Sequence, residues 1–179
     1  MAGKVNVLFE IETINRELDF RLYLASLAVN SRTRIYVGKC DLMAEVVSDT
    51  SNSLYVGKNI RPTNEDWSDR RHGRYKTLME RGHKLLWLDE EGGVFWGERH
   101  EWEQMLLRSL DPVKLRPEDE VCVWGDLQKE FYLSLKPSCG PRMETTGHPR
   151  FDLYKPKYRE YFAADVKRLS EQYLSLIHI

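Results

Sequence analysis

The sequence has few cysteines and no recognisable metal-binding pattern. Its three cysteines are scattered along the 179 residues, and no two of them form a CxxC pair: Cys40, Cys122 and Cys139. Such a set is too sparse for a disulfide framework and lacks the spacing of a zinc site. The histidines are also far apart, without an HxxxH spacing. We therefore expect free thiols in a reducing cytoplasm and no bound metal.

The chain also lacks an excess of either charge and any long apolar run. It has 27 Lys and Arg against 28 Asp and Glu, a net charge of −1, which offers no basic footprint for nucleic acid. No apolar run approaches the roughly 20 residues needed to span a bilayer. The N-terminal sequence MAGKVNVLFEIE enters a strand-like run directly, without the pattern of a signal peptide. These absences favour a cytoplasmic protein without a nucleic-acid partner or a transmembrane segment.

What is present is an alternation of short β-rich runs and amphipathic stretches, with enough apolar residues (41%) for a core. Strands are predicted at 5–11, 34–38, 53–57, the start of 83–96, 120–125 and 142–147. Helices are predicted at 15–30, 39–50, 64–82, 99–110, 126–136 and 157–173. This order predicts an α/β fold: a Rossmann-like three-layer domain with a mostly parallel sheet. Ligands of such sheets bind at the carboxyl ends of the strands, so the loops there are informative.

The first of these loops, EIETINRELD, crowds charged side chains at a strand-to-helix turn. Asn15 is a plausible helix N-cap with Glu17 in the first turn, and Leu22 lies on the predicted apolar side of the helix. Capping does not account for Glu10 or Arg16. The loop has no GxGxxG, so it is not a dinucleotide fingerprint.

The acidic turn LDEEGG follows the fourth strand. A solvated hairpin turn with Gly92 in a left-handed conformation is the interpretation that the sequence favours for Asp89, Glu90 and Glu91. The alternative is that the like charges raise the pKa of one carboxyl, which could then act as a base.

In WGDLQKE, after the fifth strand, Gly125 leaves room for the close approach of a ligand or helix. Asp126 is predicted to cap the following helix, and the amide of Gln128 to reach the crevice. By itself, this pattern is weak evidence for a ligand site.

The stretch TTGHPRFDLY follows the last strand. Gly147 ends the strand, His148 and Arg150 could face a ligand, and Pro149 fixes the turn. The equally favoured alternative is a structural corner held by an Arg150–Asp152 pair.

Five segments resemble bacterial surface carbohydrate biosynthesis proteins, which are glycosyltransferase-like proteins of the GT-B type: NRELDFRLYLA, IYVGK, GHKLLWLDEEG, VWGDLQKE and TGHPRFDLYKPKYREYF. The resemblance runs in order from Lys4 to Tyr173, and its most specific part has His148 where Asn is more usual. In outline the chain is also similar to polyol-phosphate transferases and non-hydrolysing nucleotide-sugar epimerases.

The resemblance implies the N-terminal half of a GT-B architecture, with residues 1–156 as the acceptor-side domain and 157–173 as a helix leading toward a C-terminal domain. The nucleotide-sugar donor is expected on that other half, so this half would hold no cofactor. The implied partner is a glycan or lipid-linked acceptor, which places the protein in the cytoplasm or at the inner face of the membrane. The last six residues, LSLIHI at 174–179, match the translation of a transposon end used in DNA library preparation. We expect them to be adapter-derived; the alternative is a genuine apolar tail.

The sequence thus favours part of a glycosyltransferase that moves a sugar from a nucleotide-sugar to a surface polysaccharide, inactive by itself. Substrate-binding residues are expected on two walls of a cleft: Glu10, Asn15, Arg16 and Glu17 on one, and Gly125, Gln128, Gly147, His148 and Arg150 on the other. Glu90 or Glu91 is the candidate base, and Pro149 and Asp152 are structural. The alternatives are half of an epimerase or polyol-phosphate transferase, and a standalone α/β binding module without catalysis.

Overall fold

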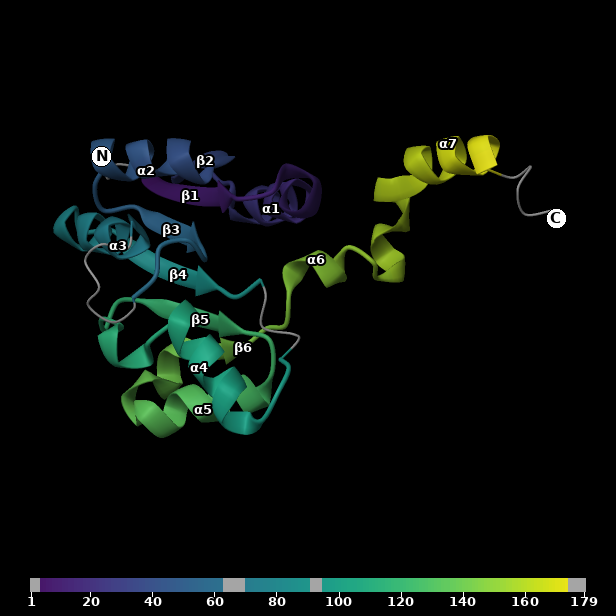
Figure 1. Ribbon diagram of the computed structural model, residues 1–179. Coiled ribbons are helices and arrows are strands. Elements are labelled where there is room, and N and C mark those ends of the chain that lie inside the picture. Colours follow the sequence, from purple (N-terminus) through teal and green to yellow (C-terminus); the bar gives the residue numbers. More distant parts are fainter. Residues whose placement is uncertain (1–3, 63–69, 91–94, 174–179) are drawn as a thin grey trace. The chain divides into compact units, whose positions relative to one another are not determined.

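The computed structural model describes residues 4–62, 70–90 and 95–173 (Figure 1). The chain divides into two compact units, residues 1–148 and residues 149–179. The boundary between the two units falls after His148.

The first unit contains a six-stranded sheet in which every neighbouring pair of strands is parallel. The strand order is β2-β1-β3-β4-β5-β6. The strands are β1 (Val5–Ile11), β2 (Thr33–Lys39), β3 (Leu54–Gly57), β4 (Lys84–Leu88), β5 (Glu120–Val123) and β6 (Met143–Thr145). The structure confirms the predicted Rossmann-like α/β domain.

Helices connect the strands of this sheet. They are α1 (Ile14–Ala28), α2 (Cys40–Asp49), α3 (Arg70–Glu80), α4 (Arg99–Ser109) and α5 (Asp126–Leu135). Two short 3₁₀ helices, η1 (Pro112–Lys114) and η2 (Pro137–Arg142), precede β5 and β6.

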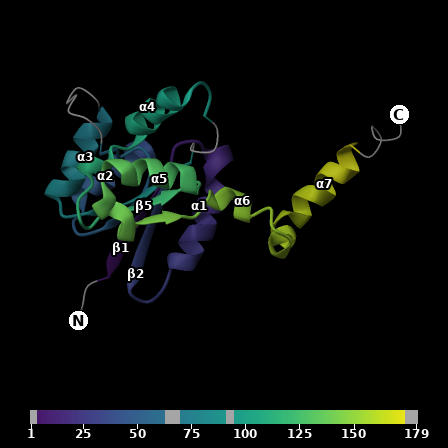
Figure 2. The ribbon, with the colours of Figure 1, turned by 90° about the horizontal axis from the view of Figure 1, so that it is seen from below.

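The strand order determines which face each helix covers. The step from β1 to β2 runs in one direction across the sheet, and every later step runs in the other. Because crossovers between parallel strands are right-handed, α1 must cover one face and α2 to α5 the opposite face. Figure 2 shows this arrangement, with α1 on the other side of the sheet from α2, α3 and α5. The order reverses between β1 and β3, which is where doubly wound sheets bind their ligands.

The core follows the same division. Leu8 of β1 packs with Met43 of α2 and Leu78 of α3, whereas Val7 and Phe9 pack with Ala25 of α1. Successive residues of β1 thus enter different layers, because side chains alternate along a strand. Strands buried on both faces read as continuous apolar runs, which explains VNVLFEI.

Helix α3 ends as the sequence predicts. The N–H of Gly82 donates to the carbonyl of Met79 over 2.9 Å, and the N–H of His83 to that of Leu78 over 3.0 Å. This is a Schellman motif, and Gly82 has the left-handed φ of 70° that it requires. The predicted start of this helix, at residue 64, lies outside the described residues.

Two expectations about α1 are wrong. Its N-cap is Thr13, and Asn15 is an exposed residue of the first turn. Leu22 is 45% exposed, whereas the buried side of the helix is formed by Glu17, Phe20, Arg21 and Ala25. The helix buries two charged residues in place of leucines because it packs against the buried polar side chains described below.

The second unit contains α6 (Pro149–Asp152), a 3₁₀ helix η3 (Pro156–Phe162) and α7 (Ala163–Tyr173). The predicted helix at 157–173 is therefore α-helical only from Ala163. Within this unit the rings of Tyr154 and Phe162 stack with centroids 6.3 Å apart. Among the described helices of both units, none is long and apolar enough to cross a membrane.

Candidate functional site

Buried polar side chains gather at the carboxyl ends of the central strands. We call them the carboxyl-edge cluster: Glu10, Glu17, Arg21, Lys58, Asn59, Asp89, Glu90 and Gln128. They come from β1, from α1, from the residues after β3 and β4, and from α5. The cluster thus spans the β1/β3 reversal of strand order, the expected ligand position in this fold.

Glu10 lies near the end of β1 and faces the residues that follow β3. The side-chain amide of Asn59 donates a hydrogen bond to its Oε1. A Cβ on Gly57 would lie 2.7 Å from its Oε2, so any larger residue there would force this carboxylate to shift. Burial raises the pKa of Glu10, although the Asn59 hydrogen bond and the charge of Arg21 act against that rise.

Glu90, the second residue after β4, pairs with Arg21 of α1. Nη2 of Arg21 donates to Oε1 of Glu90, and both side chains are 1% exposed. Burial raises the pKa of Glu90 to about 7. The positive charge of Arg21 limits this rise, and the negative charges of Glu17 and Glu10 add to it. The favoured interpretation of a solvated acidic turn is therefore wrong for Glu90, and also for Asp89, which is 5% exposed. Glu91 lies outside the described residues.

The start of α1 holds Glu17 in its ionised form. Its Oε2 accepts the backbone N–H of Glu12 at 2.6 Å, and its Oε1 lies 2.5 Å from Nη2 of Arg16. Burial raises its pKa and is the largest single influence, but the hydrogen bonds from Arg16, Glu12 and Thr13 together lower the pKa. Glu12 also pairs with Nζ of the buried Lys58 at 3.0 Å. These four side chains thus form a chain of alternating charges.

A second set of contacts links β4 to β5 and α5. Nε2 of Gln128 donates to Oδ2 of Asp89 at 2.5 Å, while its Oε1 accepts the N–H of Trp124 at 3.0 Å. The indole N–H of Trp124 donates to the carbonyl of Asp89 over 3.0 Å. The side-chain amide of Gln128 therefore links the ends of β4 and β5 through both of its polar atoms. The predicted cap at Asp126 is wrong: Gly125 is the N-cap, and Asp126 accepts a hydrogen bond from Thr145 at 2.8 Å.

Glycine at two strand ends leaves space beside these contacts. Among the described residues, nothing lies within 4 Å of a Cβ built on Gly125 or Gly147. Gly147 also has a φ of 67°, which favours glycine, and its N–H donates to the carbonyl of Val123 over 3.2 Å. The adjacent His148 is buried between two rings, edge-on to Phe20 at 5.0 Å and to Trp124 at 5.3 Å.

The remaining predicted residues belong to the second unit. Pro149, Arg150 and Asp152 form α6, and Asp152 lies 2.5 Å from Nζ of Lys155. The guanidinium of Arg150 lies over the ring of Phe151, 5.4 Å from its centroid.

The carboxyl-edge cluster differs from a second group of buried polar side chains, around Asp119 at the opposite end of the sheet. Both oxygens of Asp119 accept hydrogen bonds: Oδ1 from Leu85 N–H at 3.0 Å, and Oδ2 from Tyr75 at 2.6 Å. Arg116 adds an ion pair of 2.6 Å. In the carboxyl-edge cluster, by contrast, the described part of the chain offers no hydrogen-bond partner for Oε2 of Glu10, Oε2 of Glu90, or Nε and Nη1 of Arg21. Buried polar atoms without partners are costly, which is typical of a site that a ligand completes.

Of the predicted residues, the structure therefore brings Glu10, Glu17, Glu90 and Gln128 into the cluster. Arg16 pairs with Glu17 at 2.5 Å, and Asn15 is exposed outside the cluster. Sequence reasoning missed Arg21, Lys58 and Asn59. Arg21 follows Glu17 by four residues and so shares its helix face, and Lys58 and Asn59 directly follow β3. The helical spacing and the position after a strand could both have indicated these residues, because ligands are expected at the carboxyl ends of the strands.

No group of three or more His, Cys, Asp and Glu side chains within residues 4–62, 70–90 and 95–173 could hold a metal ion. No family model matches the chain. No curated protein and no solved structure matches it either.

Proposed function

We propose that the first unit is the acceptor-side domain of a GT-B-type glycosyltransferase for a bacterial surface polysaccharide, with Glu90 as the general base. The observation that carries the proposal is Glu90 itself. It is a buried carboxyl with a pKa raised to about 7, one oxygen on Arg21 and the other without a partner in the described residues. A general base works best when its pKa lies near the working pH.

The proposed step is transfer of a glycosyl group. Oε2 of Glu90 accepts the proton of an acceptor hydroxyl as that oxygen attacks the anomeric carbon of the donor. The new C–O bond forms while the bond to the nucleoside diphosphate breaks, and the diphosphate leaves with the electron pair. Arg21 holds the Glu90 carboxylate in place, and Oε2 of Glu10 accepts a second acceptor hydroxyl. The donor and its diphosphate bind to the other half of the enzyme.

The chemistry of the carboxyl-edge cluster supports a polyhydroxyl ligand. The buried atoms that have no hydrogen-bond partner in the described residues are of two kinds. Carboxylate oxygens of Glu10 and Glu90 accept hydrogen bonds, and N–H groups of Arg21 donate them. A sugar hydroxyl does both, so a single acceptor sugar can satisfy atoms of both kinds. Trp124, whose indole N–H donates to the carbonyl of Asp89, supplies an aromatic ring next to the cluster.

The test is a binding titration followed by NMR of the amides of Gly57, Gly125 and Gly147. A panel of mono- and oligosaccharides is added to the 179-residue chain, with UDP-glucose and CDP-glycerol as donor probes. The proposal expects saccharide-induced shifts at these glycines and none from either donor. Tight binding of UDP-glucose or CDP-glycerol, seen as shifts at these glycines, would place the donor in this domain and would contradict the proposal.

Catalysis is tested in a two-domain enzyme that carries this domain. Glu90→Gln should retain acceptor binding and lose transfer from the nucleotide-sugar by at least about 100-fold, the usual contribution of a general base. Unchanged transfer in a folded Glu90→Gln enzyme would remove Glu90 from the mechanism. Turnover with CDP-polyols but not with UDP-sugars would favour a polyol-phosphate transferase.

A further inference from the structure

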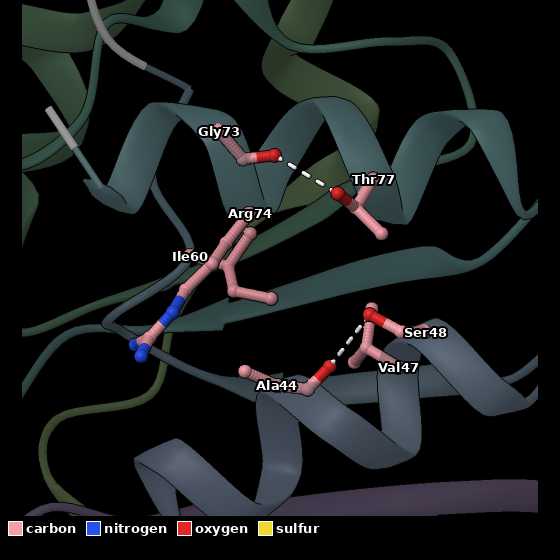
Figure 3. A pocket seen from close by; sticks show the side chains of 7 residues that line it. All are labelled: Ala44, Val47, Ser48, Ile60, Gly73, Arg74 and Thr77. Atoms are coloured by element: carbon pink, nitrogen blue, oxygen red, sulfur yellow. Dashed lines mark hydrogen bonds between the residues drawn. The ribbon is translucent and has the colours of Figure 1, made fainter. Parts of the chain in front are cut away.

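A pocket of about 260 Å³ lies between α2 and α3, apart from the carboxyl-edge cluster. Figure 3 shows side chains from the two helices facing each other across it, with Arg74 extended along one end. Ala44, Val47 and Ser48 come from α2, and Gly73 and Thr77 from α3. Ile60, three residues after β3, also lines the pocket. The volume is somewhat below that of drug-sized ligand sites and suits a small molecule.

The hollow exists because small residues face each other across the two helices. A Cβ built on Gly73 would meet no described atom within 4 Å, so packing does not require glycine there. Glycine inside a helix costs roughly 0.5–1 kcal/mol relative to alanine. Glycine at position 73 has no side chain, so it leaves the pocket between α2 and α3 open. Ser48 and Thr77 donate to the carbonyls of Ala44 and Gly73, at 3.0 and 3.1 Å, which leaves their oxygens as acceptors.

Arg74 gives the pocket a charged end. Its Nη2 lies 3.0 Å from Oδ1 of Asp41, whose side chain is 70% exposed. The Arg74 side chain is itself mostly buried, at 15% exposed. A guanidinium has five N–H donors in a planar fork, so it can hold a second anion beside Asp41.

We propose that this pocket binds a small organic anion. A carboxylate or phosphate group pairs with Arg74, and a short apolar body packs against Ala44, Val47 and Ile60. The pocket is separate from the carboxyl-edge cluster, and the inference does not depend on the proposed glycosyl transfer. The two sites are nevertheless close: Ile60 follows Asn59, which holds Glu10, and the charge of Arg74 acts on Glu10.

The test uses butyrate as the probe and butan-1-ol as its neutral counterpart. Each is titrated into the 179-residue chain while the amide signals of Ala44, Gly73 and Thr77 are followed by NMR. We expect saturable shifts with butyrate and binding of butan-1-ol that is weaker by about tenfold or more, since the alcohol lacks the charge-assisted hydrogen bond. Equal affinity for the two probes, or no saturable shift, would overturn the proposal.

Three variants locate the site. Arg74→Gln should weaken butyrate binding by about tenfold or more, and Gly73→Leu should abolish it by filling the space. Asp41→Asn removes the carboxylate that competes for the guanidinium and should strengthen binding. Gly73→Leu improves helix propensity, so it tests the pocket in a folded chain even if Arg74→Gln is unstable. Undiminished butyrate binding in Gly73→Leu would contradict the proposal.

Discussion

Arg21 of α1 and Glu90 after β4 form an ion pair that is almost completely buried, although 69 residues separate them in the sequence. Only one guanidinium nitrogen and one carboxylate oxygen take part in it, and the remaining atoms of both groups have no partner in the described residues. A pair built purely for stability would be fully hydrogen-bonded, as Arg116 and Asp119 are at the other end of the sheet. The incomplete pair is therefore the clearest sign of a functional site.

Replacing Arg21 with methionine should destabilise the protein in a pH-dependent way. At pH 8 the variant leaves a buried Glu90 carboxylate without its partner, which costs about 3–5 kcal/mol of unfolding free energy. At pH 5 the loss should be smaller, because Glu90 is then protonated and carries no charge. Urea unfolding at the two pH values measures both losses. Arg99→Met is the control, since Arg99 is 69% exposed in its pair with Glu103 and should cost less than about 1 kcal/mol. A loss for Arg21→Met no larger than the control would mean that the pair is not buried in solution.

Glu90 should make stability fall as the pH rises. Its pKa is about 7 in the folded protein against 4.5 in the unfolded chain, so the folded state binds the proton more tightly. This contribution is fully present below pH 4.5 and is lost as the pH rises through about 7; the shift corresponds to roughly 3 kcal/mol. Glu90→Gln should remove this part of the pH dependence, as measured by unfolding free energies between pH 4.5 and pH 8. An unchanged pH dependence in Glu90→Gln would be inconsistent with the raised pKa.

Gly57→Ala should disturb the carboxyl-edge cluster, because it displaces Glu10. The added Cβ would lie 2.7 Å from Oε2 of Glu10 and 3.1 Å from the Tyr55 ring, so the carboxylate must shift. We expect a loss of about 1–3 kcal/mol in unfolding free energy. Gly73→Ala is the matched control, because it meets no described atom and should stabilise α3 by about 0.5–1 kcal/mol. The same sign for both variants would contradict the close contact at Gly57.

Asp119 should matter for stability alone. Asp119→Ala removes the acceptor for Leu85 and Tyr75 and leaves Arg116 without its buried partner, a loss of about 3–5 kcal/mol. Glu118→Ala, at a half-exposed partner of the same arginine, should cost less than about 1 kcal/mol. Saccharide binding by Asp119→Ala, measured where it is folded, should match that of the unaltered chain. Specific loss of binding would show that the two polar clusters are coupled.

The alternation of apolar runs and amphipathic stretches was sufficient to predict the parallel sheet, because each strand of such a sheet is buried on both faces. It was also sufficient to place Glu10 and Glu17 at the turn between the first strand and the first helix. It could not predict that Glu90 is buried, because an acidic run before two glycines has the composition of a solvated turn. The partner that buries it, Arg21, lies 69 residues away on a helix whose leucines suggested a different inner face. Contacts between distant segments of this kind depend on the strand order, which local patterns do not specify.

The most direct test of the account is the titration of Glu90 itself, followed through its carboxyl ¹³C signal in the 179-residue chain. The signal is assigned by its absence in Glu90→Gln. We expect a midpoint near pH 7, set by burial and limited by Arg21. A midpoint near 4.5, the value of an exposed glutamate, would show that Glu90 is solvated and would remove the proposed base.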